Sequence, residues 1–170
     1  MPKINHQVVT FSASCTERTG GVPTYHGGHG VVWDNDRQKL YALSGGDLQT
    51  FNLKNWETEQ PELTKIAAVK LPERMGHDLQ AVKNSELLSL STDNHCWFYN
   101  RETQKITLHN SLENESHVKC ISEHPSNGQI AYVHGENGKW WAENIRFKNP
   151  DDIITLKGAR IYKVRWSSNE

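Results

Sequence analysis

The sequence predicts an all-β fold of the β-propeller kind, with three four-stranded antiparallel blades and one unfinished blade. The first observation behind this prediction is a repeat. The polar residues His29, His77, Lys119 and Lys163, each at or next to the start of an apolar run, are separated by 48, 42 and 44 residues. The second is register, because the next apolar run of each full copy starts 10 or 11 residues after that polar residue. A period of about 40 to 50 residues with several short strands is typical of propeller blades.

We interpret the chain as one domain divided by this repeat. Residues 1–28 supply a terminal strand and a loop, residues 29–75, 76–117 and 118–160 each form a blade, and residues 161–170 begin an incomplete blade. Propellers close by pairing strands in one blade, and small closed forms have about four blades. The chain is therefore either a minimal ring with a thin fourth blade or the carboxy-terminal half of a larger propeller, and we favour the second.

The strands of each copy follow from apolar runs separated by polar turns. In the first copy we expect strands over residues 30–34, 40–43, 48–53 and 66–71, after a terminal strand over 8–12. In the second we expect strands over residues 79–82, 86–91, 95–99 and 106–109. The third has predicted strands over residues 118–122, 129–133, 140–147 and 153–156, and the chain closes with a strand over 161–166. We expect Trp33, Trp97 and Trp166 to be wedges between blades.

Composition limits the partners and the location of the protein. The 170 residues are 35% hydrophobic and 23% charged, with a formal net charge of -1, so no overall field favours nucleic acid or an anionic membrane. No apolar run is long enough for a membrane span or a signal peptide, and we expect a soluble chain without assigning a compartment. Three cysteines, an odd number spread widely, argue against a disulfide framework.

A resemblance is visible in the order of the motifs. GHGVVWD, LYALSGGDLQTF, GHDL, HCWFYNRETQK, VKCIS, GQIAYV and YKVRW follow one another along the chain. This order is similar to the carboxy-terminal part of an uncharacterised family of bacterial β-propeller proteins, WD40-like or lyase-like, covering about residues 27–166. The resemblance implies a ring of six or seven blades in proteins that are often secreted or lipid-anchored. It implies no established activity.

The candidate ligand site follows from propeller geometry. The starts of innermost strands converge around a central channel, so we expect these side chains to face water and to lie together: His29, His77, Asp78, Lys119 and Lys163. Two lysines and two histidines against one aspartate predict a locally cationic pocket for a carboxylate or phosphate. An acidic saccharide fits such a pocket, with Tyr162 and either Trp141 or Trp140 as stacking surfaces.

Other chemistries remain as alternatives. Histidine and aspartate side chains are ligand types that suit zinc or manganese, and propeller lyases that bind a metal through channel histidines offer an analogy. The candidate ligands in this chain are His26, His29, His77, Asp78 and His117. The spacing forms no HExxH, paired CxxC or HxH motif, so we expect no cofactor and keep a divalent metal as the alternative. The sequence contains no GxSxG motif, so nothing in it indicates a hydrolase of that type.

Three functions therefore remain: a binding protein for an anionic small molecule or acidic saccharide, a lyase or hydrolase acting on acidic sugars, and an interaction scaffold with an inert channel. Whether the protein is an enzyme stays open. Open blade faces also predict self-association, because they expose apolar surface.

Overall fold

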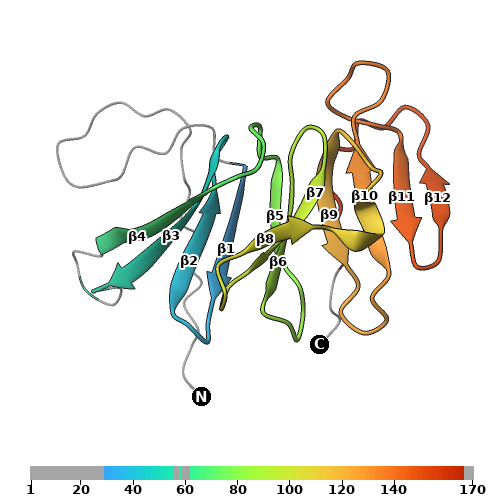
Figure 1. The fold of residues 1–170 in the computed structure, drawn as a ribbon. Helices are drawn as coiled ribbons and strands as arrows, with labels where there is room; N and C mark the ends of the chain where they lie inside the picture. The colour runs from blue at the N-terminus through green and yellow to red at the C-terminus, as the bar shows by residue number, and fades with distance from the viewer. Residues whose placement is uncertain (1–28, 56–57, 59–61, 167–170) are drawn as a thin grey trace.

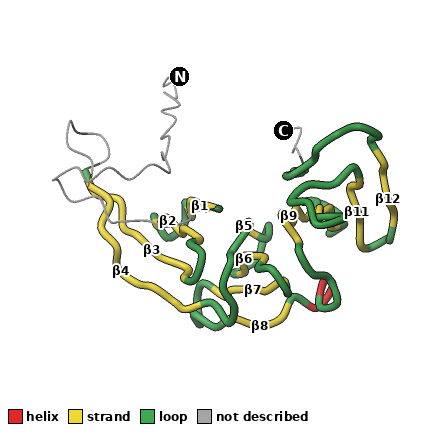
Figure 2. The backbone as a smooth tube through the Cα atoms, turned by 90° about the horizontal axis from the view of Figure 1, so that it is seen from above, coloured by secondary structure: helices red, strands yellow, loops and turns green. Residues whose placement is uncertain are grey.

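The computed structural model describes residues 29–55, 58 and 62–166, which form three four-stranded antiparallel sheets. Figure 1 shows the sheets following one another across the molecule. Figure 2, the view from above, shows them fanned out, with β1, β5 and β9 on the inner side of the fan and β4, β8 and β12 on the outer side. The predicted all-β fold is therefore confirmed, with three complete blades in a propeller-like arrangement.

Each sheet is a meander whose strands run from inside to outside in chain order. The first sheet contains β1 (Gly30–Asp34), β2 (Lys39–Leu43), β3 (Asp47–Lys54) and β4 (Glu62–Lys70). The second contains β5 (Asp78–Ala81), β6 (Leu87–Ser91), β7 (Cys96–Asn100) and β8 (Ile106–Leu108). A 3-10 helix (Asn110–Leu112) precedes the third sheet, which contains β9 (Val118–Glu123), β10 (Ile130–His134), β11 (Asn144–Lys148) and β12 (Asp152–Thr155).

Short polar side chains form the turns between these strands. Asp34 Oδ1 accepts hydrogen bonds from the backbone N–H groups of Asp36 and Arg37, at 3.1 and 3.0 Å, and so holds the turn into β2. Asn100 Oδ1 accepts from the N–H groups two and three residues further on, at 2.9 and 2.8 Å. Such side chains replace backbone acceptors in a turn, which is why the polar runs of the sequence mark the strand ends.

The core lies between the sheets. The side chains buried between the first and second sheets are Tyr41, Leu43, Leu48, Leu71, Leu79, Leu88, Leu90 and Tyr99. Those buried between the second and third are Cys96, Leu112, Val118, Ile121, Ile130 and Tyr132. Full burial of such a side chain stabilises the fold by about 1.5 to 3 kcal/mol, so these two layers hold the sheets together.

The inner strands β1 and β5 approach each other closely. A Cβ atom added to Gly30 would lie 2.7 Å from the backbone nitrogen of Leu79 and 2.8 Å from its Cβ atom. Glycine is therefore required by the approach of the two strands, and this contact holds His29, the preceding residue, next to the second sheet.

The carboxy-terminal segment differs from the prediction. Residues 161–166 form no ladder strand, because only Ile161 is bridged, to Ala142. The backbone N–H groups of Val164 and Trp166 instead donate to side chains of β9, Cys120 Sγ at 3.2 Å and Ser122 Oγ at 3.0 Å. The segment therefore lies along β9 and β10, where Ile161 and Val164 pack on Cys120 and Val133.

Two further predictions need correction. The strand expected over 140–147 is restricted to β11, because residues 135–143 form a turn and the bridge to Ile161. Trp33 is not a wedge, since it is 41% exposed. Trp97 does pack against the first core layer, and Trp166 contacts Phe147 with ring centroids 6.0 Å apart.

Three remaining points concern the terminal strand, the cysteines and membrane-spanning helices. The strand expected over 8–12 lies outside. Cys96 and Cys120 are buried free thiols. No helix among the described residues is long and apolar enough to cross a membrane.

Candidate functional site

The structure brings together the five residues predicted from the starts of the inner strands. His29 directly precedes β1, His77 and Asp78 lie at the start of β5, Lys119 lies near the start of β9, and Lys163 comes from the carboxy-terminal segment. Asp93, in the turn between β6 and β7, and Arg165 join them through contacts given below. We call these seven residues the polar cluster.

Asp78 is the anchor of the polar cluster. It is 1% exposed, and its Oδ2 atom accepts a 2.9 Å hydrogen bond from the backbone N–H of Ile121 in the third sheet. Its Oδ1 atom accepts from Lys163 Nζ and from Arg165 Nη2, each at 2.6 Å. A buried carboxylate is tolerated when it is paired and hydrogen-bonded in this way. Asp78 therefore joins two sheets and the carboxy-terminal segment.

Lys163 crosses the inner side of the fan. Besides Asp78, its ammonium donates to the backbone carbonyl oxygens of His77 at 2.9 Å and His29 at 3.2 Å. One side chain thus links the carboxy-terminal segment to the first and second sheets. The three donors of an ammonium group allow these three contacts.

His77, Asp93 and Lys119 form a second set of contacts. His77 Nε2 lies 2.6 Å from Asp93 Oδ1 and 2.8 Å from Lys119 Nζ, and Lys119 Nζ lies 3.4 Å from the same Asp93 oxygen. A ring nitrogen either donates or accepts, so when Nε2 donates to Asp93 the lysine retains only the longer contact to the carboxylate. The ammonium of Lys119 then has hydrogen-bonding capacity to spare.

Burial determines the protonation of this set. Burial lowers the pKa of His77 below 6.5, and the charge of Lys119 lowers it further, although the hydrogen bond to Asp93 opposes both. Burial would raise the pKa of Asp93, but its hydrogen bond to His77 and the charges of His77 and Lys119 bring it below 3.8. Near neutral pH the set therefore holds a neutral imidazole, a carboxylate and a lysine.

His29 is the exposed member of the polar cluster. Its ring lies edge-on to that of His77, with centroids 5.8 Å apart, and makes no hydrogen bond to the other described residues. Partial burial lowers its pKa below 6.5, and the charges of Lys163 and Lys119 lower it further. Two cations of the polar cluster therefore act on this imidazole.

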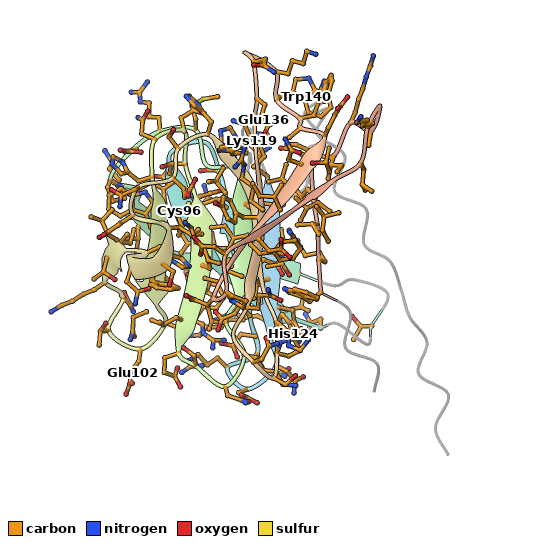
Figure 3. All side chains as sticks on the ribbon, turned by 90° about the vertical axis from the view of Figure 1, so that its right-hand side faces the viewer. Cys96, Glu102, Lys119, His124, Glu136 and Trp140 are labelled. Atoms are coloured by element: carbon orange, nitrogen blue, oxygen red, sulfur yellow. The ribbon has the colours of Figure 1, made fainter. Side chains whose placement is uncertain are left out.

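Of the two remaining predicted site residues, Tyr162 lies beside Lys163 of the polar cluster, whereas Trp141 contacts residues outside the cluster. The ring centroid of Tyr162 is 5.3 Å from Lys163 Nζ and 5.3 Å from the Trp140 ring. Trp141, on the loop between β10 and β11, faces Lys139 and Arg160 instead. Figure 3 shows Lys119 and Trp140 at the same end of the molecule.

Two expectations about the site need correction. His77 and Lys119 are only 7% and 8% exposed, so neither side chain faces open water. The cluster also holds two carboxylates rather than one, and its permanent cations are three. Period-two alternation from Lys163 could have found Arg165, which lies on the same face of an extended segment. Asp93 gave no comparable signal, because its turn meets His77 only in the folded chain.

The candidate metal ligands do not come together among the described residues. Among the described residues no group of three or more His, Cys, Asp and Glu side chains could hold a metal ion. His117 is exposed and meets the neighbouring turns through its backbone, and His26 lies outside the described residues.

A cavity of about 370 Å³ lies further along the inner strands. Gln80, Ser122, Glu123 and Trp166 line it, together with Arg165 from the polar cluster. The five residues predicted for the site do not line it.

Comparison with known proteins identifies a family from nearly the whole chain. Residues 5–170 match the family described as "Family of unknown function (DUF6528)". The chain belongs to DUF6528. A search of curated proteins gives no match.

Solved structures that match this DUF6528 chain in part share little sequence with it. Hsv2 of Kluyveromyces marxianus is 12% identical, with a TM-score of 0.42, over 78% of this chain and 38% of its own. Hsv2 of Kluyveromyces lactis is 11% identical, with a TM-score of 0.44, over 76% of this chain and 36% of its own. The chain thus spans less than two-fifths of these structures, and its fold is assigned from its own three sheets.

Proposed function

We propose that the chain binds an anionic small molecule or an acidic saccharide at the polar cluster. The observation that supports this most directly is the position of the exposed His29 imidazole. Its ring meets that of His77 edge-on, Lys119 Nζ lies 2.8 Å from His77 Nε2, and Lys163 Nζ lies 3.2 Å from the His29 carbonyl oxygen. Three permanent cations face two carboxylates there, so one positive charge is not neutralised within the cluster. An anion placed beside His29 would complete the charge balance.

The proposed roles follow from the contacts. The exposed His29 would donate to the carboxylate or phosphate, and the buried Lys119 would add its positive charge beneath it. Tyr162 lies beside Lys163 as an aromatic surface. Asp78 and Asp93 orient the cations, since each already accepts charged donors.

An enzymatic function is the second candidate. A lowered pKa leaves His29 neutral near pH 7, as a general base that removes a proton next to a carboxylate must be. A lyase acting on acidic sugars would use that chemistry, and the unsaturated product absorbs in the ultraviolet. Absorbance that grows when polygalacturonate is incubated with the protein, and stays flat with His29→Ala, would favour the lyase over the binding protein.

Calorimetric titration of the folded chain with galacturonate, glucuronate and inorganic phosphate tests the binding proposal, with galactose as the neutral control. We expect the acids to bind and galactose not to bind. His29→Ala and Lys119→Met should each weaken binding about tenfold, equivalent to ~1.4 kcal/mol. Lys65→Ala, which removes an exposed lysine on β4, is the matched control and should bind as the wild type does.

The proposal is wrong if none of the acids binds the folded wild type, or if galactose binds as tightly as galacturonate. In that case the polar cluster serves only to join the sheets, and the protein is an interaction scaffold.

Two broader statements are also proposals. The order of motifs supports membership of exported bacterial propellers with six or seven blades. Exposed Val31 and Trp33 on the first sheet support self-association. Sedimentation that does not change with concentration would contradict the second.

A further inference from the structure

Two loop segments beside the polar cluster form a surface of aromatic rings and cations. Lys139 Nζ lies 4.4 Å and Arg160 Cζ 5.4 Å from the ring centroid of Trp141. Trp140, at 61% exposure the most exposed of the large hydrophobic side chains described, meets the ring of Tyr162 edge-on with centroids 5.3 Å apart. We call Lys139, Trp140, Trp141, Arg160, Tyr162 and Lys163 the aromatic surface.

Backbone contacts fix the two segments side by side. Ala142 and Ile161 exchange both hydrogen bonds of an antiparallel bridge, at 3.0 and 2.9 Å. The N–H of Lys139 donates to the carbonyl of Glu136 at 2.9 Å, which closes the turn before the tryptophans. The backbone that carries the rings and cations is therefore held in place before any ligand arrives, which reduces the entropy cost of binding.

The aromatic surface continues into the polar cluster. Lys163 belongs to both, since its ammonium lies 5.3 Å from the Tyr162 ring centroid and 2.6 Å from Asp78 Oδ1. A chain-like ligand could therefore contact both sites at once.

The charges around the aromatic surface are mainly positive. The sequences KWW at 139–141 and KGARIYK at 157–163 carry four cations and no acid. The neighbouring Glu136 is paired with Arg146 at 2.9 Å, and Glu143 Oε1 accepts the N–H of Gly158 at 3.0 Å. These two carboxylates are thus engaged away from Lys139 and Arg160.

We propose that the aromatic surface binds further units of an acidic oligosaccharide, one unit of which occupies the polar cluster. The inference rests on the proposed function and narrows its ligand from a single small anion to a chain of uronate-like sugars. The apolar C–H face of a sugar ring would lie against Trp140, and the carboxylates would meet Lys139 and Arg160. Trp141 then orients the two cations, while Trp140 is the stacking surface.

A chain of sugars fits these features better than a nucleic acid. The formal net charge of -1 gives the protein no long-range attraction for a polyanion of high charge density. Exposed indole combined with a few spaced cations suits a ligand whose rings are partly apolar and whose charges are spaced apart.

Calorimetric titration with galacturonate and hexagalacturonate tests the inference, with the methyl-esterified hexamer as the neutral match. We expect the hexamer to bind the wild type at least about tenfold more tightly than the monomer. Trp140→Ala should weaken hexamer binding about three- to tenfold, the range expected for one aromatic contact, and leave monomer binding unchanged. Lys139→Ala and Arg160→Ala should act in the same selective way.

Matched controls separate this surface from general effects. Trp33→Ala removes another exposed tryptophan, on the first sheet, and Lys65→Ala removes an exposed lysine on β4. Both should leave hexamer binding as in the wild type. An oligothymidylate and vesicles of phosphatidylcholine with phosphatidylserine serve as the other anionic partners.

The outcomes distinguish the two proposals. Equal affinity for monomer and hexamer, unchanged in Trp140→Ala, overturns the oligosaccharide inference and leaves the small-anion site standing. Absence of binding by both sugars and by inorganic phosphate overturns the proposed function as well. Equal binding of the esterified hexamer overturns the acidic ligand class. Binding of the oligothymidylate or the vesicles that depends on Trp140, without uronate binding, assigns the surface to that partner instead.

Discussion

Two buried aspartates, Asp34 and Asp78, each join neighbouring sheets, yet their surroundings differ in charge balance. Asp34 ends β1 and Asp78 begins β5, so they lie toward opposite ends of the inner strands. Their side chains are 2% and 1% exposed. Burial is therefore the same for both, and only the partners differ.

The ion network around Asp34 closes on itself. Its Oδ2 atom accepts from Arg101 at 2.6 Å and from Arg37 at 3.1 Å, and Arg37 also pairs with Glu86 of the second sheet. Two arginines thus balance two carboxylates. Arg101 also donates to the carbonyl oxygens of Ser85 and Glu86, which leaves its guanidinium well satisfied.

The polar cluster around Asp78 does not close in this way. Lys163 and Arg165 share a single oxygen of Asp78, and Lys119 has only the longer contact to Asp93 when His77 donates to that carboxylate. One cation exceeds the carboxylates, next to an exposed imidazole. This difference is why we propose a ligand site at the unbalanced network beside an exposed donor, and none at the closed network.

The largest expected effect breaks the closed network. Asp34→Ala should lower the free energy of unfolding by about 3 kcal/mol, because it leaves two arginines at the junction of the sheets without their shared carboxylate. Urea denaturation measures the loss. Asp34→Asn should lose less, since it keeps the acceptor for the turn N–H groups, and exposed Asp36→Ala should lose almost nothing. Asp34→Ala as stable as Asp36→Ala would mean that this network does not hold the sheets.

The next effect is the pH dependence of stability that comes from His109, a buried group outside both ion networks. His109 is 1% exposed, stacks on Phe98 with centroids 4.0 Å apart, and its Nδ1 atom has no hydrogen-bond partner among the described residues. Burial lowers its pKa from 6.5 to about 4. The unfolded chain therefore binds a proton that the folded chain refuses between these values, and stability falls as the pH falls from 6.5 to about 4.

The contribution of His109 over this interval is about 3 kcal/mol. His109→Phe keeps the stacking, removes the titration, and should flatten the pH dependence of urea denaturation by that amount. Exposed His117→Phe is the control and should keep the wild-type slope. The same slope in both variants would assign the loss of stability at acid pH to other groups.

In the His109→Phe background, the stabilisation from the Asp34 network should be lost below pH 3.8. The hydrogen bonds of Asp34 to Arg37 and the charge of Arg101 outweigh burial and lower the pKa of Asp34.

A smaller effect tests the junction next to the polar cluster. Gly30→Ala should lower the free energy of unfolding by about 1 to 3 kcal/mol, because the added Cβ meets the backbone of Leu79. The anion affinity should fall as well, since His29 precedes Gly30. Gly46→Ala places its Cβ in open space and is the control. Unchanged anion affinity in a destabilised Gly30→Ala would separate His29 from the ligand.

The sequence was sufficient for the sheets because period and register are local properties. The predicted strand over 30–34 coincides with β1, and the predicted starts of the other inner strands lie within one residue of the observed ones. The segment 161–166 was less predictable. Its apolar pattern is that of an inner strand, but a ladder needs a partner strand, and its N–H groups turn to Cys120 and Ser122 instead.

The convergence of five residues at the candidate site was predictable, whereas the contacts of Asp93 and Arg165 and the chemistry of the cluster were not. Convergence of inner strands brought His29, His77, Asp78, Lys119 and Lys163 together. Which of them is buried, and against what, depends on turns that meet only in the fold. Asp93 reaches His77 from a turn 16 residues away, and this contact changes a solvent-facing histidine into a buried one.

The smallest expected effect is a pH dependence of anion affinity, which should depend on His29 in the polar cluster and not on the Asp34 network. A protonated His29 attracts an anion more strongly than a neutral one, and burial together with Lys163 and Lys119 holds its pKa below 6.5. The affinity of the wild type for galacturonate should therefore rise severalfold between about pH 7.5 and about pH 5, where histidines titrate. His29→Gln keeps a hydrogen-bond donor without the titration, so its affinity should stay flat over that range, and its urea denaturation should match the wild type within about 0.5 kcal/mol because the side chain is exposed. Asp34→Asn should keep the wild-type pH slope, since the Asp34 network lies away from His29. If His29→Gln retains the full slope, the proton belongs to another group such as His77, and His29 is not the residue that meets the ligand.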